Sequence, residues 1–263
     1  MTVDLRSVLA KLGRADEHAQ TIKSHLKRWR DSNPYLITRE HNAEFTRYSL
    51  VAHIAAQPPL VQWSLIVGDA IHNLRSALDH LVYALAIFES HQNPPPCHSS
   101  LQFPICVSDD EFIKTKRLGR LSDPVRAAIK GFQPYIRKHP DLPPLLSILN
   151  KFENADKHKL LQLAFASVAQ GDIGFTGVAP IGTVVEAFAN PGEVEEGTEV
   201  VAYTFSKPAP DMKFDRINLL IALMIVHDVG PNGKDRTDAP SLLTLLDKEV
   251  RGIVEKVANV ALS

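Results

Sequence analysis

The chain has 263 residues, of which 44% are hydrophobic, enough for a folded domain with a substantial core. Its 29 lysines and arginines nearly balance its 30 aspartates and glutamates, so the whole molecule has no bulk attraction for nucleic acid or an anionic membrane. The longest apolar run, residues 219–226, is much shorter than the roughly 20 residues that cross a bilayer, and residues 1–20 lack the apolar core of a secretory signal. With two cysteines, no disulfide framework is expected. We therefore expect a cytoplasmic protein that does not associate with membranes.

Apolar residues recur at helical spacing in several stretches, and each predicts an amphipathic helix. The strongest is residues 61–88, which follow Pro58-Pro59 and precede Pro94-Pro95-Pro96, where a helix could not continue. Its apolar stripe consists of Val67, Ile71, Leu74, Leu78, Leu81 and Leu85. The other predicted helices are residues 4–30, 109–121, 123–135, 143–162 and 241–260.

The opposite face of the central helix contains neither lysine nor glutamate, although both are common on a solvated helix face. Its side chains are short and polar: Asp69, His72, Asn73, Ser76, Asp79, His80 and Tyr83. Such side chains suit close, defined contacts. We therefore expect this face to be shielded from bulk solvent, either by residues 150–158 or by a second copy of the chain.

Two regions are rich in strand-forming residues. Residues 35–54 predict a β-hairpin, and residues 163–229 predict a longer antiparallel β-rich segment punctuated by glycine and proline turns. Residues 217–227 are so apolar that a buried strand and a helix are both consistent with them, and a strand is preferred because the preceding pattern is β.

The order of these elements predicts an α+β fold, since strands and helices are grouped rather than alternating. We expect one domain over residues 1–263. Its core is a helical bundle built on residues 61–88, against which residues 4–30, 143–162 and 241–260 pack. The β-rich segment 163–229 is inserted within this helical core, and the hairpin 35–54 lies near its start.

The central helix carries the first candidate site, Arg75 and His80. Arginine can hold a phosphate in a planar fork, and histidine can move protons near neutral pH. Asp69, His72, Asn73 and Asp79 would support them. The simpler alternative is structural: Arg75 and Asp79 are four residues apart and can form an ordinary ion pair within the helix, and His80 can hydrogen-bond to a neighbouring helix.

The stretch Arg75-Ser76-Ala77-Leu78-Asp79-His80 resembles the arginine, four residues, histidine motif of HEPN-type domains. Together with Asn154-Ala155-Asp156-Lys157-His158, the stretch from Gly68 to Leu81 also resembles an uncharacterised bacterial family of similar length. HEPN domains are helical bundles, many of them metal-independent endoribonucleases that act as dimers. The resemblance implies that Arg75 holds the phosphate, that His80 is the acid or base, and that a homodimer juxtaposes two motifs to cleave single-stranded RNA.

A second polar cluster, which includes Asn150, Asn154, Asp156 and His158, is predicted near the end of helix 143–162. If it faces the central helix, histidines and carboxylates from both would converge, and such ligands suit zinc or a non-haem metal. The alternative is a helix-terminal ion-pair cluster in which Lys157 partners Glu153. Because no strong ligand motif is present, we expect no bound metal and no cofactor.

The most basic run in the chain consists of Lys114, Lys116, Arg117 and Arg120. It is either a solvated helix end or a patch that contacts an RNA backbone. Two classes of function remain open. One is a metal-independent endoribonuclease, and the other is a non-catalytic dimerisation or small-ligand-binding protein on the same helical scaffold.

Overall fold

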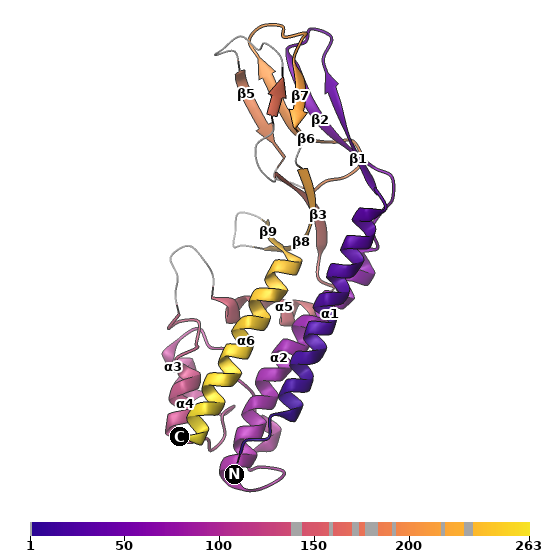
Figure 1. Cartoon of the computed structure of the whole chain (residues 1–263). Helices are drawn as coiled ribbons and strands as arrows, with labels where there is room; N and C mark the ends of the chain where they lie inside the picture. Colours follow the sequence, from indigo (N-terminus) through magenta and orange to yellow (C-terminus); the bar gives the residue numbers. More distant parts are fainter. Residues whose placement is uncertain are drawn as a thin grey trace. The chain divides into compact units, whose positions relative to one another are not determined.

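The structure is a computed structural model that describes residues 2–137, 144–157, 160–169, 174–176, 184–190, 193–216, 219–228 and 234–263. It has the predicted mixed α+β class (Figure 1). The chain forms two compact units. The helical unit comprises Met1–Lys23, Val61–Leu161 and Ala239–Ser263, and the β unit comprises Ser24–Leu60 and Gln162–Asp238.

Three long helices make the core of the helical unit: α1 (Arg6–Asp31, up to Lys23), α2 (Leu60–Ser90) and α6 (Ala239–Leu262). All three confirm helices predicted from the apolar spacing. The stripe of α2 is fully buried, and α1 and α6 contribute their own apolar stripes to the same unit. Polar contacts also join them, since Lys23 Nζ donates to Thr244 Oγ1 at 3.2 Å and Arg251 Nη2 donates to the Leu12 carbonyl at 3.4 Å.

The end of α2 is set by local chemistry as well as by the prolines beyond it. His91 adopts a left-handed φ of 56°, and its N–H donates to the Ile87 carbonyl at 2.8 Å. A left-handed residue after the last turn stops a helix while satisfying a terminal carbonyl. The chain is thereby turned away from α2 into the irregular segment that leads to Phe103.

The shorter helices of this unit are α3 (Asp109–Lys114), α4 (Asp123–Lys130) and α5 (Leu145–Asp156), with a single 3₁₀ turn at His98–Ser100. The predicted helix 109–121 is wrong beyond Lys114. Thr115 is extended, and Gly119 turns the chain with a φ of +52°. A Cβ at Gly119 would lie 2.8 Å from Leu101 Cδ2, so packing against the 101–106 segment overrides local helix propensity.

Two further helix predictions were too long. Helix α4 ends at Lys130 rather than near residue 135, and Gln133 instead turns inward to a buried position. Helix α5 ends at Asp156 rather than at residue 162, because the chain must extend to enter a strand at Leu163. Residue 143, where that helix was expected to begin, lies outside the described residues.

The β unit contains the predicted hairpin, β1 (Tyr35–His41) and β2 (Arg47–Ile54). Its register pairs Tyr35 with Ile54 and His41 with Tyr48. Strand β2 also pairs with β6 (Thr198–Phe205), which pairs with β5 (Val184–Ala189), giving an antiparallel sheet in the order β1-β2-β6-β5. The hairpin thus belongs to the same sheet as part of the β-rich segment.

A second antiparallel sheet has the order β3-β8-β9, from Leu163–Ala169, Leu219–Asp228 and Lys234–Asp238. The preference for a strand within residues 217–227 is therefore confirmed from Leu219 onward. Strand β8 is central, and residues 221–223, 225 and 226 are all buried, which explains its unbroken apolar run. A small pair, β4 (Gly174–Thr176) and β7 (Lys213–Arg216), completes the described strands.

Candidate functional site

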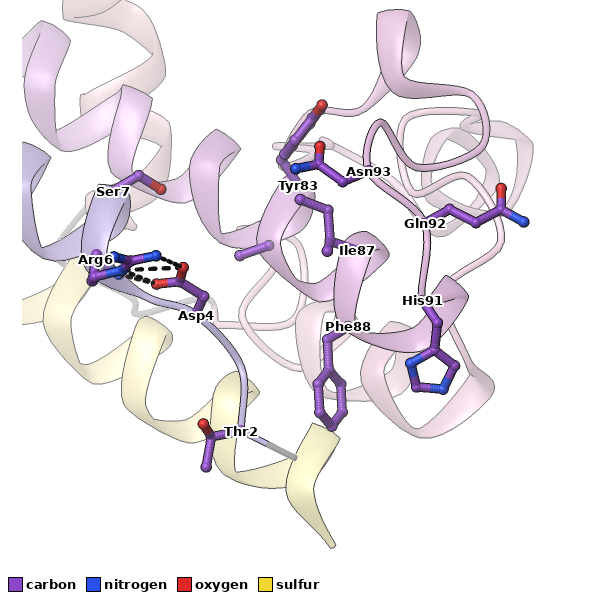
Figure 2. Close-up of a pocket in the computed structure, with 11 residues that line it drawn as sticks. Thr2, Asp4, Arg6, Ser7, Tyr83, Ile87, Phe88, His91, Gln92 and Asn93 are labelled. Carbon is purple, nitrogen blue, oxygen red and sulfur yellow. Dashed lines mark hydrogen bonds and ion pairs between the residues drawn. The ribbon is translucent and has the colours of Figure 1, made fainter.

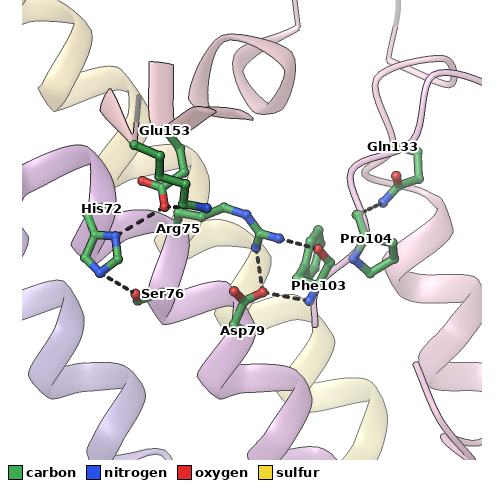
Figure 3. Close-up of polar contacts among 9 residues, drawn as sticks. His72, Arg75, Ser76, Asp79, Phe103, Pro104, Gln133 and Glu153 are labelled. Atoms are coloured by element: carbon green, nitrogen blue, oxygen red, sulfur yellow. Dashed lines mark hydrogen bonds and ion pairs between the residues drawn. The ribbon is translucent and has the colours of Figure 1, made fainter. Parts of the chain in front are cut away.

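Arg75 of α2 is buried, and its guanidinium has two acceptors (Figure 3). Nη1 donates to Asp79 Oδ1 at 2.7 Å, and Nη2 donates to the Phe103 carbonyl at 2.8 Å. The Phe103 N–H in turn donates to Asp79 Oδ1 at 2.8 Å. Arg75 and Asp79 together hold the extended segment at Phe103 against α2, so the predicted intrahelical ion pair exists and fixes a long-range contact.

The network also changes the acidity of Asp79. Burial raises the pKa of its carboxyl above the usual value, while the Arg75 charge and the hydrogen bond from Phe103 oppose that shift. The direction follows from desolvation, which penalises the ionised form. The Arg75 charge therefore favours the ionised form of this carboxylate, and the two groups together hold the chain at Phe103.

His80, one turn beyond Arg75, meets different partners. It is half-buried, and burial together with the charge of Lys11 on α1 lowers its pKa, whereas Asp79 opposes the shift. Lys11 Nζ also donates to Asn73 Oδ1 at 3.4 Å. Among the described contacts, no hydrogen bond or ion pair joins Arg75 to His80. One molecule therefore places Arg75 toward Phe103 and His80 near Lys11.

A second polar network connects α2 to α5. His72 Nδ1 lies 3.2 Å from Glu153 Oε1, and Lys157 Nζ lies 3.0 Å from the same oxygen. Because a carboxylate only accepts, the hydrogen bond fixes the His72 proton on Nδ1 and leaves Nε2 facing Ser76 Oγ at 3.4 Å. Glu153 is only 3% exposed, and its Oε2 has no partner among the described residues.

Asp156, one turn beyond Glu153, packs directly on α2 at Gly68. A Cβ added to Gly68 would lie 2.3 Å from Asp156 Oδ1, so glycine is what permits this approach. Burial raises the pKa of Asp156, and the nearby charges of Glu153 and Asp69 raise it further, against His72. The expectation that the polar face of α2 meets residues 150–158 is thus supported at two points.

Not all the predicted residues converge here. Asp69 and Asn154 are exposed, Asn150 is half-buried, and His158 lies outside the described residues. The carboxylates outnumber the permanent cations four to three, counting Asp69, Asp79, Glu153 and Asp156 against Lys11, Arg75 and Lys157. The spacing of Glu153 and Lys157 predicted their ion pair, which is confirmed, but it predicted neither the contact of Glu153 with His72 nor the position of Lys11.

The basic run is divided by the end of α3. Lys114 lies in the last turn and pairs with Asp110 at 3.1 Å. Lys116, Arg117 and Arg120 follow in the irregular turn and are exposed. They therefore form a loop surface rather than one face of a helix.

The described residues contain no group of three or more His, Cys, Asp or Glu side chains arranged to hold a metal ion. The two cysteines are both free, Cys97 exposed and Cys106 buried. Burial raises the pKa of the Cys106 thiol to about 11, with Glu111 adding to the shift. Neither cysteine therefore forms part of a described cation site.

Sequence reasoning also missed a pocket of about 860 Å³ in the helical unit (Figure 2). It lies between the N-terminal segment and the last turns of α2. Its wall is lined by Thr2, Asp4, Arg6, Ser7, Tyr83, Ala84, Ile87, Phe88, His91, Gln92 and Asn93. These residues come from two segments about 80 positions apart in the chain, so no local motif marks them.

Two charged residues that line this pocket, Asp4 and Arg6, pair with each other and are largely exposed to solvent. Arg6 Nε donates to Asp4 Oδ1 at 2.9 Å, and Arg6 Nη2 donates to Asp4 Oδ2 at 2.6 Å. The hydrogen bonds from Arg6 lower the pKa of Asp4 to about 2. The pocket thus presents an apolar wall at Ile87 and Phe88, with polar side chains and the Asp4–Arg6 pair around it.

No helix in the described part of the chain is long and apolar enough to cross a membrane. Comparison of the sequence and structure with protein families, curated proteins and solved structures finds no match.

Proposed function

We propose that this protein binds a small, uncharged organic molecule in the pocket between its N-terminal segment and α2. The observation that carries the proposal is a cavity of about 860 Å³ walled by Ile87 and Phe88. Pockets that enclose small ligands commonly have volumes of roughly 300–1,000 Å³ and apolar walls with a few polar groups. This is the binding-protein alternative among the two classes left open by the sequence.

The polar groups around the wall define the class of ligand. The Asp4–Arg6 pair leaves no unbalanced charge of its own, and Tyr83, Gln92 and Asn93 offer neutral donors and acceptors. An apolar or aromatic body with one or two hydroxyl or carbonyl groups suits this lining. A phosphorylated ligand suits it poorly, because Arg6 is already neutralised by Asp4.

The proposal is tested with N-phenyl-1-naphthylamine, a neutral dye whose fluorescence rises in an apolar site. Ile87→Trp places a bulky indole on the apolar wall of the pocket and should weaken dye binding about tenfold or more. Leu65→Trp is the matched control, since Leu65 is 52% exposed on the same helix and does not line the pocket. Equal binding by wild type and both folded variants would exclude this pocket as the binding site.

Metal-independent cleavage of single-stranded RNA is a second candidate, and the placement of Lys11 beside His80 favours it. The lowered pKa of His80 keeps its ring neutral near pH 7, as a proton acceptor must be. Lys11 supplies a nearby cation for a phosphate. In this proposal a homodimer brings two such faces together, and the exposed Lys116, Arg117 and Arg120 contact flanking RNA. Arg75 acts by positioning the helix rather than by touching substrate.

A further inference from the structure

A separate cavity of about 330 Å³ lies within the β unit, so it is independent of the pocket proposed above. Residues from the end of α1, from the 54–60 segment, from β3 and from the loop before β6 line it. They are Trp29, Ile54, Gln57, Pro58, Leu60, Leu163, Ala164, Phe165, Glu193, Val194, Glu195 and Glu196. This lining set contains three carboxylates and, among the residues described, neither lysine nor arginine.

The apolar wall of this cavity is fixed by aromatic packing. Trp29 stacks on Phe165 with ring centroids 4.7 Å apart, and Tyr35 lies against Trp29 at 5.9 Å. The indole N–H donates to the Ala56 carbonyl at 3.2 Å. Because both rings are held by neighbours, they give the cavity a rigid apolar surface that can take the hydrocarbon part of a ligand.

The carboxylate-bearing loop is anchored to the same wall. The Val194 N–H donates to the Phe165 carbonyl at 2.8 Å, and the Glu195 N–H donates to Thr198 Oγ1 at 2.8 Å. These backbone bonds hold residues 193–195 beside β3. The loop that carries the three glutamates is therefore held beside the apolar wall, with Glu193 half-buried and Glu195 and Glu196 exposed.

The three glutamates differ in their partners. Glu196 lies 2.8 Å from His53 Nδ1 and accepts from the Ile54 N–H at 2.5 Å. Those bonds lower the pKa of Glu196, so it is ionised and already engaged. Glu193 and Glu195 have no ion-pair partner among the described residues, so their two negative charges are available to attract a cation to the cavity that they line.

We propose that this cavity binds a compact organic ammonium ion whose charge meets Glu193 and Glu195 while its alkyl groups cover the Trp29–Phe165 wall. An organic cation fits better than a metal ion, because the described residues hold no metal-type ligand group and much of the wall is apolar. A cavity of about 330 Å³ admits a choline-sized ion.

The test compares choline with 3,3-dimethyl-1-butanol, which has the same shape but carries no charge. The chain has two tryptophans, so Trp63→Phe leaves Trp29 as the only indole reporter. Choline should change Trp29 fluorescence in a saturable way, and the neutral alcohol should bind at least tenfold more weakly. Calorimetry on the unmodified 263-residue chain gives the same comparison if Trp63→Phe does not fold.

The double variant Glu193→Gln/Glu195→Gln should weaken choline binding at least tenfold. Glu44→Gln is the matched control, because Glu44 is an exposed carboxylate of the same unit that does not line the cavity. Equal binding of choline and the alcohol, or unchanged choline binding in the folded double variant, would overturn the proposal. Neither result depends on the dye-binding pocket of the helical unit.

Discussion

Arg75 is bonded to the main chain of Phe103, with its guanidinium 2.8 Å from the Phe103 carbonyl oxygen. The same arginine neutralises Asp79, which accepts the Phe103 N–H. Removing the arginine therefore leaves a partly buried carboxylate uncompensated and an extended segment without its anchor. Arg75 and Asp79, two residues of the Arg75–His80 stretch, therefore stabilise the fold.

We expect Arg75→Met to lower the free energy of unfolding by about 3 kcal/mol, because breaking a buried ion pair costs far more than breaking an exposed one. Arg14→Met is the matched control, since the Arg14–Glu17 pair is exposed and should contribute less than about 1 kcal/mol. Urea denaturation followed by circular dichroism measures both. A loss for Arg75→Met no larger than for the control would show that the network is not structural.

The contact of Gly68 with Asp156 predicts a coupled effect. In the middle of a helix, Gly→Ala normally stabilises by about 1 kcal/mol. With Asp156 present, Gly68→Ala should lose that gain. The new Cβ would lie only 2.3 Å from the present position of Asp156 Oδ1, so the carboxylate would have to move. In an Asp156→Ala background the gain should reappear. A double-mutant cycle by urea denaturation measures the coupling, and additivity of the two changes would contradict the described packing.

The raised pKa of Asp156 predicts how stability changes with pH. The Asp156 carboxyl has its usual pKa of 3.8 in the unfolded chain and a higher pKa in the folded protein. Between these two values the folded state binds more protons, so the stability contributed by Asp156 falls as pH rises through that window. Asp156→Asn should therefore be more stable than wild type at pH 7, and the difference should vanish below pH 3.8. Asp16→Asn, an exposed change on α1, controls for net charge. If the wild type were more stable than Asp156→Asn at pH 7, the expected direction of this pH dependence would be wrong.

The two cysteines should differ sharply in reactivity at pH 8. A thiol with a pKa of about 11 is ionised in only about one molecule in a thousand at that pH. Ellman's reagent should therefore modify exposed Cys97 quickly and buried Cys106 slowly, with both reacting quickly in denaturant. Cys97→Ser should abolish the fast phase. A fast phase that persists in this variant would mean that Cys106 is accessible.

If the protein cleaves RNA, His80→Ala and Lys11→Ala should each lower the rate at least about a hundredfold, because both touch the reacting groups in that proposal. The assay incubates labelled single-stranded RNA with purified protein in chelator. Asp16→Ala is the control on α1, away from His80. Unchanged cleavage by the folded Lys11→Ala and His80→Ala variants would show that neither residue takes part in catalysis. Absence of cleavage by the wild type would favour the ligand-binding function over the nuclease.

The sequence by itself determined the secondary structure wherever one strong periodic pattern dominated. The apolar stripe from Val67 to Leu85 specified α2, because burying six large side chains along one face outweighs any other local preference. The sequence also favoured a strand for β8, because the segments before it have a β pattern. Its unbroken apolar run is explained by its central place between β3 and β9, since a central strand can be apolar on both faces. The spacing of Arg75 and Asp79 was enough to predict their ion pair.

Only the tertiary structure decided what the polar residues of α2 contact. Spacing along one helix cannot show that Arg75 turns toward Phe103, that His80 lies near Lys11, or that Glu153 meets His72, since each partner comes from another segment. The same holds for both cavities, whose walls join residues distant in the chain. Hydrogen bonding and desolvation depend on three-dimensional neighbours, and these neighbours are fixed only once the apolar faces have packed.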